Sequence, residues 1–144
     1  MAEVVSVNIS EKKGTVKHEV DEIKLIIDHG INGDAHAGNW HRQISLLAEE
    51  SIDKMRSIGL TLENGAFAEN INTIGIELKT LPIGTKLSIG DTVVEVTQIG
   101  KECHNDCEIK KLTGKCVMPT EGIFVIVVKE GIVKKGDKIE ILER

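Results

Sequence analysis

Aromatic side chains are nearly absent from this sequence, which has one Trp, two Phe and no Tyr among its 144 residues. Modules that bind single-stranded nucleic acid stack bases on aromatic side chains, and this chain has too few of them for such a platform. Because 40% of the residues are hydrophobic, we expect a core built from Val, Ile and Leu.

Positive charge is also scarce. The chain has 18 Lys and Arg against 23 Asp and Glu, a formal net charge of −5, and Arg only as Arg42, Arg56 and Arg144. Proteins that neutralise a phosphate backbone carry the opposite balance. We therefore expect no nucleic acid among its partners.

Long apolar runs are missing as well. No stretch approaches the roughly 18 apolar residues of a membrane-spanning helix, and Met1–Gly14 lacks the basic start and apolar run of a signal peptide. In such a chain three cysteines are expected to be reduced thiols rather than a disulfide framework. The sequence thus predicts no membrane partner and a cytoplasmic location.

Short segments rich in β-branched residues, separated by many of the 14 glycines, predict a mostly β fold. The length suits one domain, residues 1–144. The predicted strands are Val4–Ile9, Glu22–Asp28, Gln43–Leu47, Lys86–Ile89, Thr92–Ile99, Gly122–Lys129 and Lys138–Leu142. Ala48–Ile58 is a predicted helix, with acidic residues in its first turn and Gly59 to end it. We expect a closed β-barrel with one or two short helices, because closure removes exposed strand edges.

Polar and charged residues gather in a first segment between Gly33 and Gln43. Glycines would let backbone N–H groups approach an anion there, and the planar guanidinium of an Arg suits phosphate or carboxylate. The candidate residues of this segment are Gly33, Asp34, His36, Gly38 and Arg42, and the segment also contains Trp40 and His41. In the alternative interpretation Asp34 caps a turn, the histidines lie on the surface and Trp40 anchors the barrel.

All three cysteines lie in a second segment, Cys103–Cys116, close to Lys101 and His104. Thiolate rather than thiol is the nucleophile and the soft-metal ligand, and neighbouring cations favour it. Three interpretations stay open from the residues alone. One is a reactive or cofactor-binding thiolate, and another is buried inert cysteines. The third is a zinc site made by Cys103, His104, Cys107 and Cys116, although the spacing lacks the tight C-x₂-C pair of common zinc modules.

Two polar pairs outside these segments have two interpretations each. Glu69-Asn70 either forms a solvated turn, which we favour, or positions a loop or ligand. Thr97-Gln98, at the end of a predicted strand, faces either a pocket or solvent.

Several motifs together, in this order, resemble the MOSC domain, named for the C-terminal domain of molybdenum-cofactor sulfurase, in its short stand-alone bacterial form. The resemblance covers nearly the whole chain, and a set of motifs in one order is more specific than any one of them. The motifs are Gly33-Asp34-x-His36-x-Gly38, Arg42–Leu47, Phe67–Ile71, Leu81–Gly84, Thr97–His104 and Met118–Phe124.

The resemblance implies a barrel-like β fold and a role around the molybdenum cofactor, either carrying sulfur as a cysteine persulfide or holding the cofactor through a thiolate. It implies Cys107 as the key residue and metal ligand, with Cys103 as its rival and Cys116 as a second thiol. Residues implied around the cofactor are Arg42, Asp34, His36, Gly33, Gly38, Lys101 and His104.

Full-length sulfurases make the persulfide on an additional domain that uses pyridoxal phosphate, for which 144 residues leave no room. The resemblance therefore implies that a separate cysteine desulfurase, which would hold the pyridoxal phosphate, or a molybdoenzyme is the partner. Two other functions stay open. One is a zinc-stabilised, non-catalytic interaction module, and the other is a small enzyme that acts on modified purines through Asp34, His36 and the cysteines.

Overall fold

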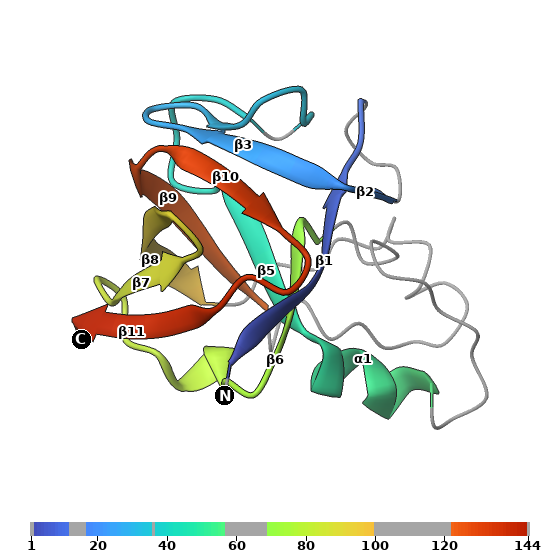
Figure 1. Cartoon of the computed structure of the whole chain (residues 1–144). Helices are drawn as coiled ribbons and strands as arrows, with labels where there is room; N and C mark the ends of the chain where they lie inside the picture. Colours follow the sequence, from blue (N-terminus) through green and yellow to red (C-terminus); the bar gives the residue numbers. More distant parts are fainter. Residues whose placement is uncertain (1, 12–16, 36, 57–68, 100–121, 144) are drawn as a thin grey trace, which may run out of the picture.

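The computed structural model of the chain describes residues 2–11, 17–35, 37–56, 69–99 and 122–143, and strands dominate these ranges (Figure 1). The predicted mostly β class is confirmed. The elements are β1 Glu3–Ile9, β2 His18–Val20, β3 Glu22–Ile26, β4 Gly30–Ile31, β5 Ile44–Ala48, α1 Glu49–Arg56, β6 Ile71–Ile74, the 3-10 helix η1 Leu78–Thr80, β7 Lys86–Ile89, β8 Thr92–Ile99, β9 Ile123–Lys129, β10 Gly131–Lys134 and β11 Ile139–Glu143.

Most strands belong to one eight-stranded sheet, in the order β11-β7-β8-β9-β5-β6-β1-β2, and a three-stranded sheet has the order β10-β3-β4. The β5–β6 pair is parallel and the other pairs are antiparallel. β5 therefore lies between β9 and β6, near the middle of the molecule (Figure 1).

The predicted closed barrel is not confirmed, because the large sheet ends at β11 on one side and at β2 on the other. Only the start of β1 reaches the other end of the sheet: the Val4 N–H donates to the Asp137 carbonyl at 2.8 Å, and the Ile139 N–H donates to the Ala2 carbonyl at 3.0 Å. Further along, β1 pairs with β2 instead, from Val7 to Ile9. One edge of β1 therefore contacts the segment before β11 at its start and pairs with β2 at its end, so the eight-stranded sheet does not close into a barrel.

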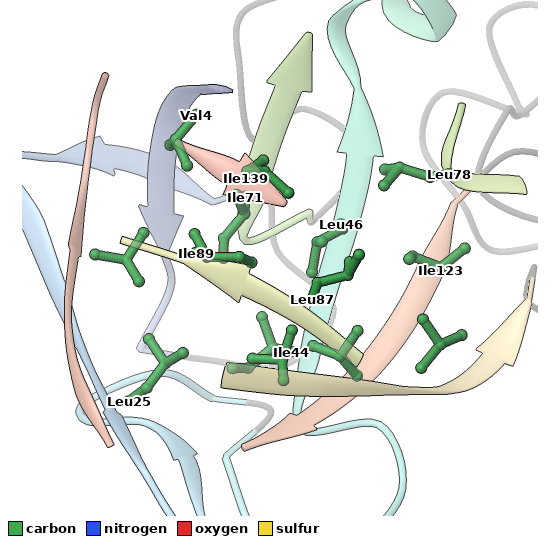
Figure 2. Close-up of a cluster of buried hydrophobic side chains, with 14 of the residues drawn as sticks. Val4, Leu25, Ile44, Leu46, Ile71, Leu78, Leu87, Ile89, Ile123 and Ile139 are labelled. Carbon is green, nitrogen blue, oxygen red and sulfur yellow. The ribbon is translucent and has the colours of Figure 1, made fainter. Parts of the chain in front are cut away.

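The core is aliphatic, as expected from the composition. Buried side chains of β5, β6, β7 and β9 point toward one another, among them Ile44, Leu46, Ile71, Leu87 and Ile123 (Figure 2). All five have an exposed fraction of 0%. At about 25 cal/mol per Å² of apolar surface removed from water, such burial is the main source of stability.

The predicted hairpin from Lys86 to Ile99 is confirmed, since Ile89 pairs with Thr92 across the two-residue turn Gly90-Asp91. The predicted helix exists as α1, one residue shorter at its start, and its predicted end lies outside the described residues. β3 ends before Asp28, whose positive φ of 62° begins the turn into β4. No helix in the described ranges has the length and apolar character needed to cross a bilayer.

Candidate functional site

The central strands bury both of their faces. Side chains alternate along a strand, so Ile44 and Leu46 of β5 enter the core while Ser45 and Leu47 lie on the opposite face. We call this second face the outer face. Ser45 has an exposed fraction of 5% and Leu47 of 0%, so the outer face is also shielded from water.

Strand register extends the outer face across the sheet, because residues paired on neighbouring strands share a face. Ser45 of β5 pairs with Phe124 of β9, and Phe124 pairs with Gln98 of β8. On the other side of β5, the side-chain oxygen of Asn70 accepts hydrogen bonds from the Ser45 N–H at 3.0 Å and the Ser45 hydroxyl at 3.2 Å. The Asn70 amide nitrogen donates to the Asn8 carbonyl of β1 at 3.1 Å.

Polar side chains of β1, β5, β6 and the two residues before β6 form a continuous group on this face that we call the polar row. Its members, each at most 5% exposed, are Ser6, Asn8, Ser45, Glu69, Asn70 and Asn72. The Asn72 amide donates to a Glu69 carboxylate oxygen at 2.7 Å, and its own oxygen accepts from Ser6 and Asn8, each at 2.7 Å. Buried polar groups are costly unless they are hydrogen-bonded, and these are. The favoured interpretation of Glu69-Asn70 as a solvated turn is therefore wrong.

Asp34 is anchored inside the protein by a buried ion pair. Its carboxylate accepts from the Lys17 ammonium group at 2.7 Å and from the Ser10 N–H at 3.1 Å, and both side chains of the pair are fully buried. Burial by itself would raise the pKa of Asp34. The hydrogen bond and charge of Lys17, with further hydrogen bonds from Ser10 and Asn70, hold this pKa below its ordinary value of 3.8.

A second polar group lies at the entrance to β5, beside the end of β8. The Gln98 side-chain oxygen is 3.0 Å from Arg42 Nε and 3.0 Å from His41 Nε2. The Arg42 guanidinium carbon lies 5.4 Å from the centre of the Phe124 ring, in a cation–π contact. We call Gln98, His41 and Arg42 the Gln98 cluster. Trp40, 38% exposed, meets the His41 ring edge to face at 6.0 Å.

A β-bulge aims two consecutive side chains of β8 at this cluster. Val96 pairs with Val125 but Gln98 pairs with Phe124, so Thr97 is an extra residue on β8. The Thr97 hydroxyl hydrogen-bonds the His41 carbonyl and lies 3.2 Å from the Phe124 carbonyl. Bulges commonly re-aim side chains next to functional sites.

The sequence candidates separate into two sets. Arg42 enters the Gln98 cluster and Asp34 the buried ion pair, while the Cβ position of Gly33 faces open space and that of Gly38 faces the Trp40 ring at 3.7 Å. His36, Lys101, Cys103, His104, Cys107 and Cys116 lie outside the described residues. Among the residues that the structure does describe, no three His, Cys, Asp or Glu side chains are grouped to hold a metal ion.

The described strand residues that flank this part of the sequence pair with each other. Ile99, the last residue of β8, pairs with Ile123, the first residue of β9. The next pair along the same ladder is Gln98 with Phe124. The chain therefore leaves and re-enters the sheet directly beside the Gln98 cluster.

Several buried polar residues escaped the sequence analysis. Ser6 and Asn8 alternate with Val7 along β1, a period of two that signals a strand with one polar face. That signal was available. No sequence signal marked Lys17, because a lysine partner for Asp34 can be recognised only once the chain is folded.

Comparison with known proteins gives one family and a set of solved structures. The MOSC domain model matches residues 33–140. The crystal structure of the YUAD protein from Bacillus subtilis superposes with a TM-score of 0.81 at 20% identity, covering 100% of this chain and 97% of that one. The crystal structure of YiiM from Geobacillus stearothermophilus superposes with a TM-score of 0.75 at 19% sequence identity, covering 100% of this chain and 76% of that one. The crystal structure of YiiM from Escherichia coli has a TM-score of 0.69 at 21% identity, covering 100% of this chain and 71% of that one. No curated protein matches the sequence.

Proposed function

Because the chain belongs to the MOSC domain family, whose members are associated with the molybdenum cofactor, we propose that it binds this cofactor or carries sulfur for it through Cys107. Cys103 is the rival residue for the same role. The observation that supports the proposal is the pairing of Ile99 with Ile123, the strand residues on either side of the cysteine segment in the sequence, next to the pair of Gln98 with Phe124.

The Gln98 cluster suits the phosphate with which the pterin part of the cofactor ends. Arg42 Nε donates a hydrogen bond to Gln98, and one face of the guanidinium contacts the Phe124 ring. The terminal nitrogens are the donors that a phosphate would take, in the paired geometry that Arg offers. Molybdenum accepts soft sulfur ligands, so a cysteine thiolate suits the other end of the cofactor. When bound, the cofactor would supply the metal chemistry, while Arg42 binds its phosphate and Gln98 orients Arg42.

Sulfur loading in this proposal needs a partner. The Cys107 thiolate attacks the terminal sulfur of a persulfide on a separate cysteine desulfurase, a new S–S bond forms, and the donor's S–S bond breaks to release its cysteine thiolate. Electrons balance without an added oxidant, as in other thiol exchanges. The partner's pyridoxal phosphate would do the preceding chemistry, and a molybdoenzyme would accept the sulfur or the cofactor.

The experiment compares four proteins purified without oxygen from cells that make molybdenum cofactor: the wild type, Cys107→Ser, Cys103→Ser and Cys116→Ser. We expect bound molybdenum with pterin, or an intact mass increased by one sulfur atom, in every protein except Cys107→Ser. Cys116→Ser is the matched control, since it removes a thiol of the same segment.

Other outcomes would contradict the proposal. Loss of sulfur or cofactor only in Cys103→Ser would move the role to the rival thiol. Stoichiometric zinc without molybdenum, with unfolding on chelation, would establish the zinc-stabilised module instead. Turnover of modified purines without bound molybdenum would establish the small enzyme.

A further inference from the structure

The Gln98 cluster has an unusual arrangement, because two consecutive residues share one acceptor atom. Arg42 Nε and His41 Nε2 each lie 3.0 Å from the side-chain oxygen of Gln98. These residues come from distant parts of the sequence, the entrance to β5 and the end of β8. This shared contact determines which atoms of Gln98 and His41 donate and which accept, as well as where the side chains lie.

Arg42 determines which atom of Gln98 faces the pair. The Nε–H of an arginine can only donate, so its partner must be the amide oxygen and not the amide nitrogen. An amide oxygen can only accept. The His41 nitrogen that faces it, Nε2, must therefore carry a proton. In neutral His41 the other nitrogen, Nδ1, is then an acceptor.

The backbone and the neighbouring rings hold this geometry. The Thr97 hydroxyl donates a hydrogen bond to the His41 carbonyl. The bulge at Thr97 brings this hydroxyl to the same side of β8 as the Gln98 side chain. The Phe124 ring supports the guanidinium plane of Arg42. His41 stays exposed and Arg42 half-buried, so a ligand in solution can reach both.

We infer that Gln98 is a positioning residue that holds Arg42 and His41 as a two-pronged site for the phosphate group of a monoester. The terminal nitrogens of Arg42 donate to two phosphate oxygens. His41 Nδ1 and a third phosphate oxygen share one hydrogen bond. The phosphate supplies the proton of this hydrogen bond when His41 is neutral. The inference rests on the proposed function only for the identity of the ligand, because the site recognises the phosphate end of any such ester.

A first test reads the histidine directly. In ¹⁵N NMR spectra of the full-length protein, with His41→Gln used to assign the signal, His41 is expected as the Nε2–H tautomer. Gln98→Ala should move the signals toward a mixture of tautomers. Gln98→Glu, which keeps an accepting oxygen, should preserve the tautomer. His18→Gln, an exposed change on β2, is the control. An Nδ1–H tautomer in the wild type, or no change in Gln98→Ala, would overturn the inference.

A second test measures anion binding with inorganic phosphate and with sulfate, which carries no proton near neutral pH. Phosphate is expected to bind more tightly than sulfate, and His41→Ala should abolish that preference. Arg42→Gln and Gln98→Ala should each weaken phosphate about tenfold, the loss expected for one charge-assisted hydrogen bond. Gln98→Glu should weaken it further through charge repulsion.

Equal binding of phosphate by the wild type and Arg42→Gln, or by the wild type and His41→Ala, would overturn the inference. The outcome is independent of the cysteines. Loss of molybdenum binding in Cys107→Ser tests the proposed function, whereas these two measurements can succeed or fail without it.

Discussion

At the scale of single residues, Lys17 and Asp34 form a buried ion pair whose loss is expected to destabilise the protein. Removing one partner of a buried pair leaves the other charge without compensation, which typically costs about 3–5 kcal/mol. Both side chains are fully buried and 2.7 Å apart. Asp34 also receives hydrogen bonds from Ser10 and Asn70, so it joins two chain segments to the polar row.

Asp34→Asn is therefore expected to lower the free energy of unfolding by about 3–5 kcal/mol, measured by urea denaturation at neutral pH. Asp91→Asn, in the exposed turn between β7 and β8, is the matched control and should change stability by less than about 0.5 kcal/mol. Equal effects of the two substitutions would show that the ion pair contributes nothing.

The pKa of Asp34 makes this stability depend on pH with a definite sign. Because the folded protein holds that pKa below the ordinary 3.8, the stabilisation is present above 3.8 and is lost as the pH falls through the folded-state value. The wild type should thus lose unfolding free energy below about pH 4, and Asp34→Asn should lack this part of the loss. Parallel acid curves for both proteins would contradict the assignment.

At the scale of elements, sequence patterns located one regular hairpin and missed the irregular features that build the site. β-branched runs predicted the β7–β8 hairpin, because local turn chemistry and alternation suffice there. The bulge at Thr97 adds one residue to an otherwise regular strand, and nothing in the local sequence marks it. β2, β4, β6 and β10 were not predicted, since these short strands lack a local turn or alternation signal and depend on their neighbours for pairing.

Arg42 was identified as a candidate from its chemistry, but its partner Gln98 lies on another strand, and only the fold brings the two together. The same holds for Asn70, which local sequence placed in solvent and which the fold buries between β1 and β5. Contacts between residues far apart in sequence are the part of the site that composition and spacing do not encode.

β4 and the turn that follows it offer a test at this scale. Gly30 has a φ of +107°, and a Cβ atom there would lie 2.9 Å from the Gln43 carbonyl oxygen. Gly33 has a φ of +85° with nothing within 4 Å of its Cβ position. Gly33→Ala should cost the backbone strain alone, about 1–3 kcal/mol. Gly30→Ala should cost more, because the clash is with backbone that cannot move aside.

Thermal or urea unfolding of the two variants checks this expectation, with the difference between them as the quantity of interest. The larger loss in Gly30→Ala would confirm that the start of β4 packs closely against Gln43 at the entrance to β5. A larger loss in Gly33→Ala would contradict the described conformation.

At the scale of the whole molecule, one sheet serves two purposes on its two faces. The inner face of β5 supplies the apolar core, and the outer face carries the polar row and, at the strand's entrance, Arg42 of the Gln98 cluster. Rigid packing behind a site holds its side chains in position. The core therefore stabilises the site without contributing any group to it.

Leu46→Ala should lower the free energy of unfolding by about 2–5 kcal/mol, the usual cost of a cavity in an aliphatic core. Leu142→Ala, at a position 53% exposed on β11, is the matched control and should cost far less. Urea denaturation of both variants supplies the comparison. Similar losses would mean that Leu46 does not lie in the core.

We propose above all that this MOSC-family chain handles the molybdenum cofactor or its sulfur through Cys107. The most direct measurement is the molybdenum, pterin and added sulfur of the anaerobically purified wild type beside Cys107→Ser. We expect bound cofactor or one added sulfur atom in the wild type and neither in Cys107→Ser. The same content in both proteins, or none in the wild type, would contradict it.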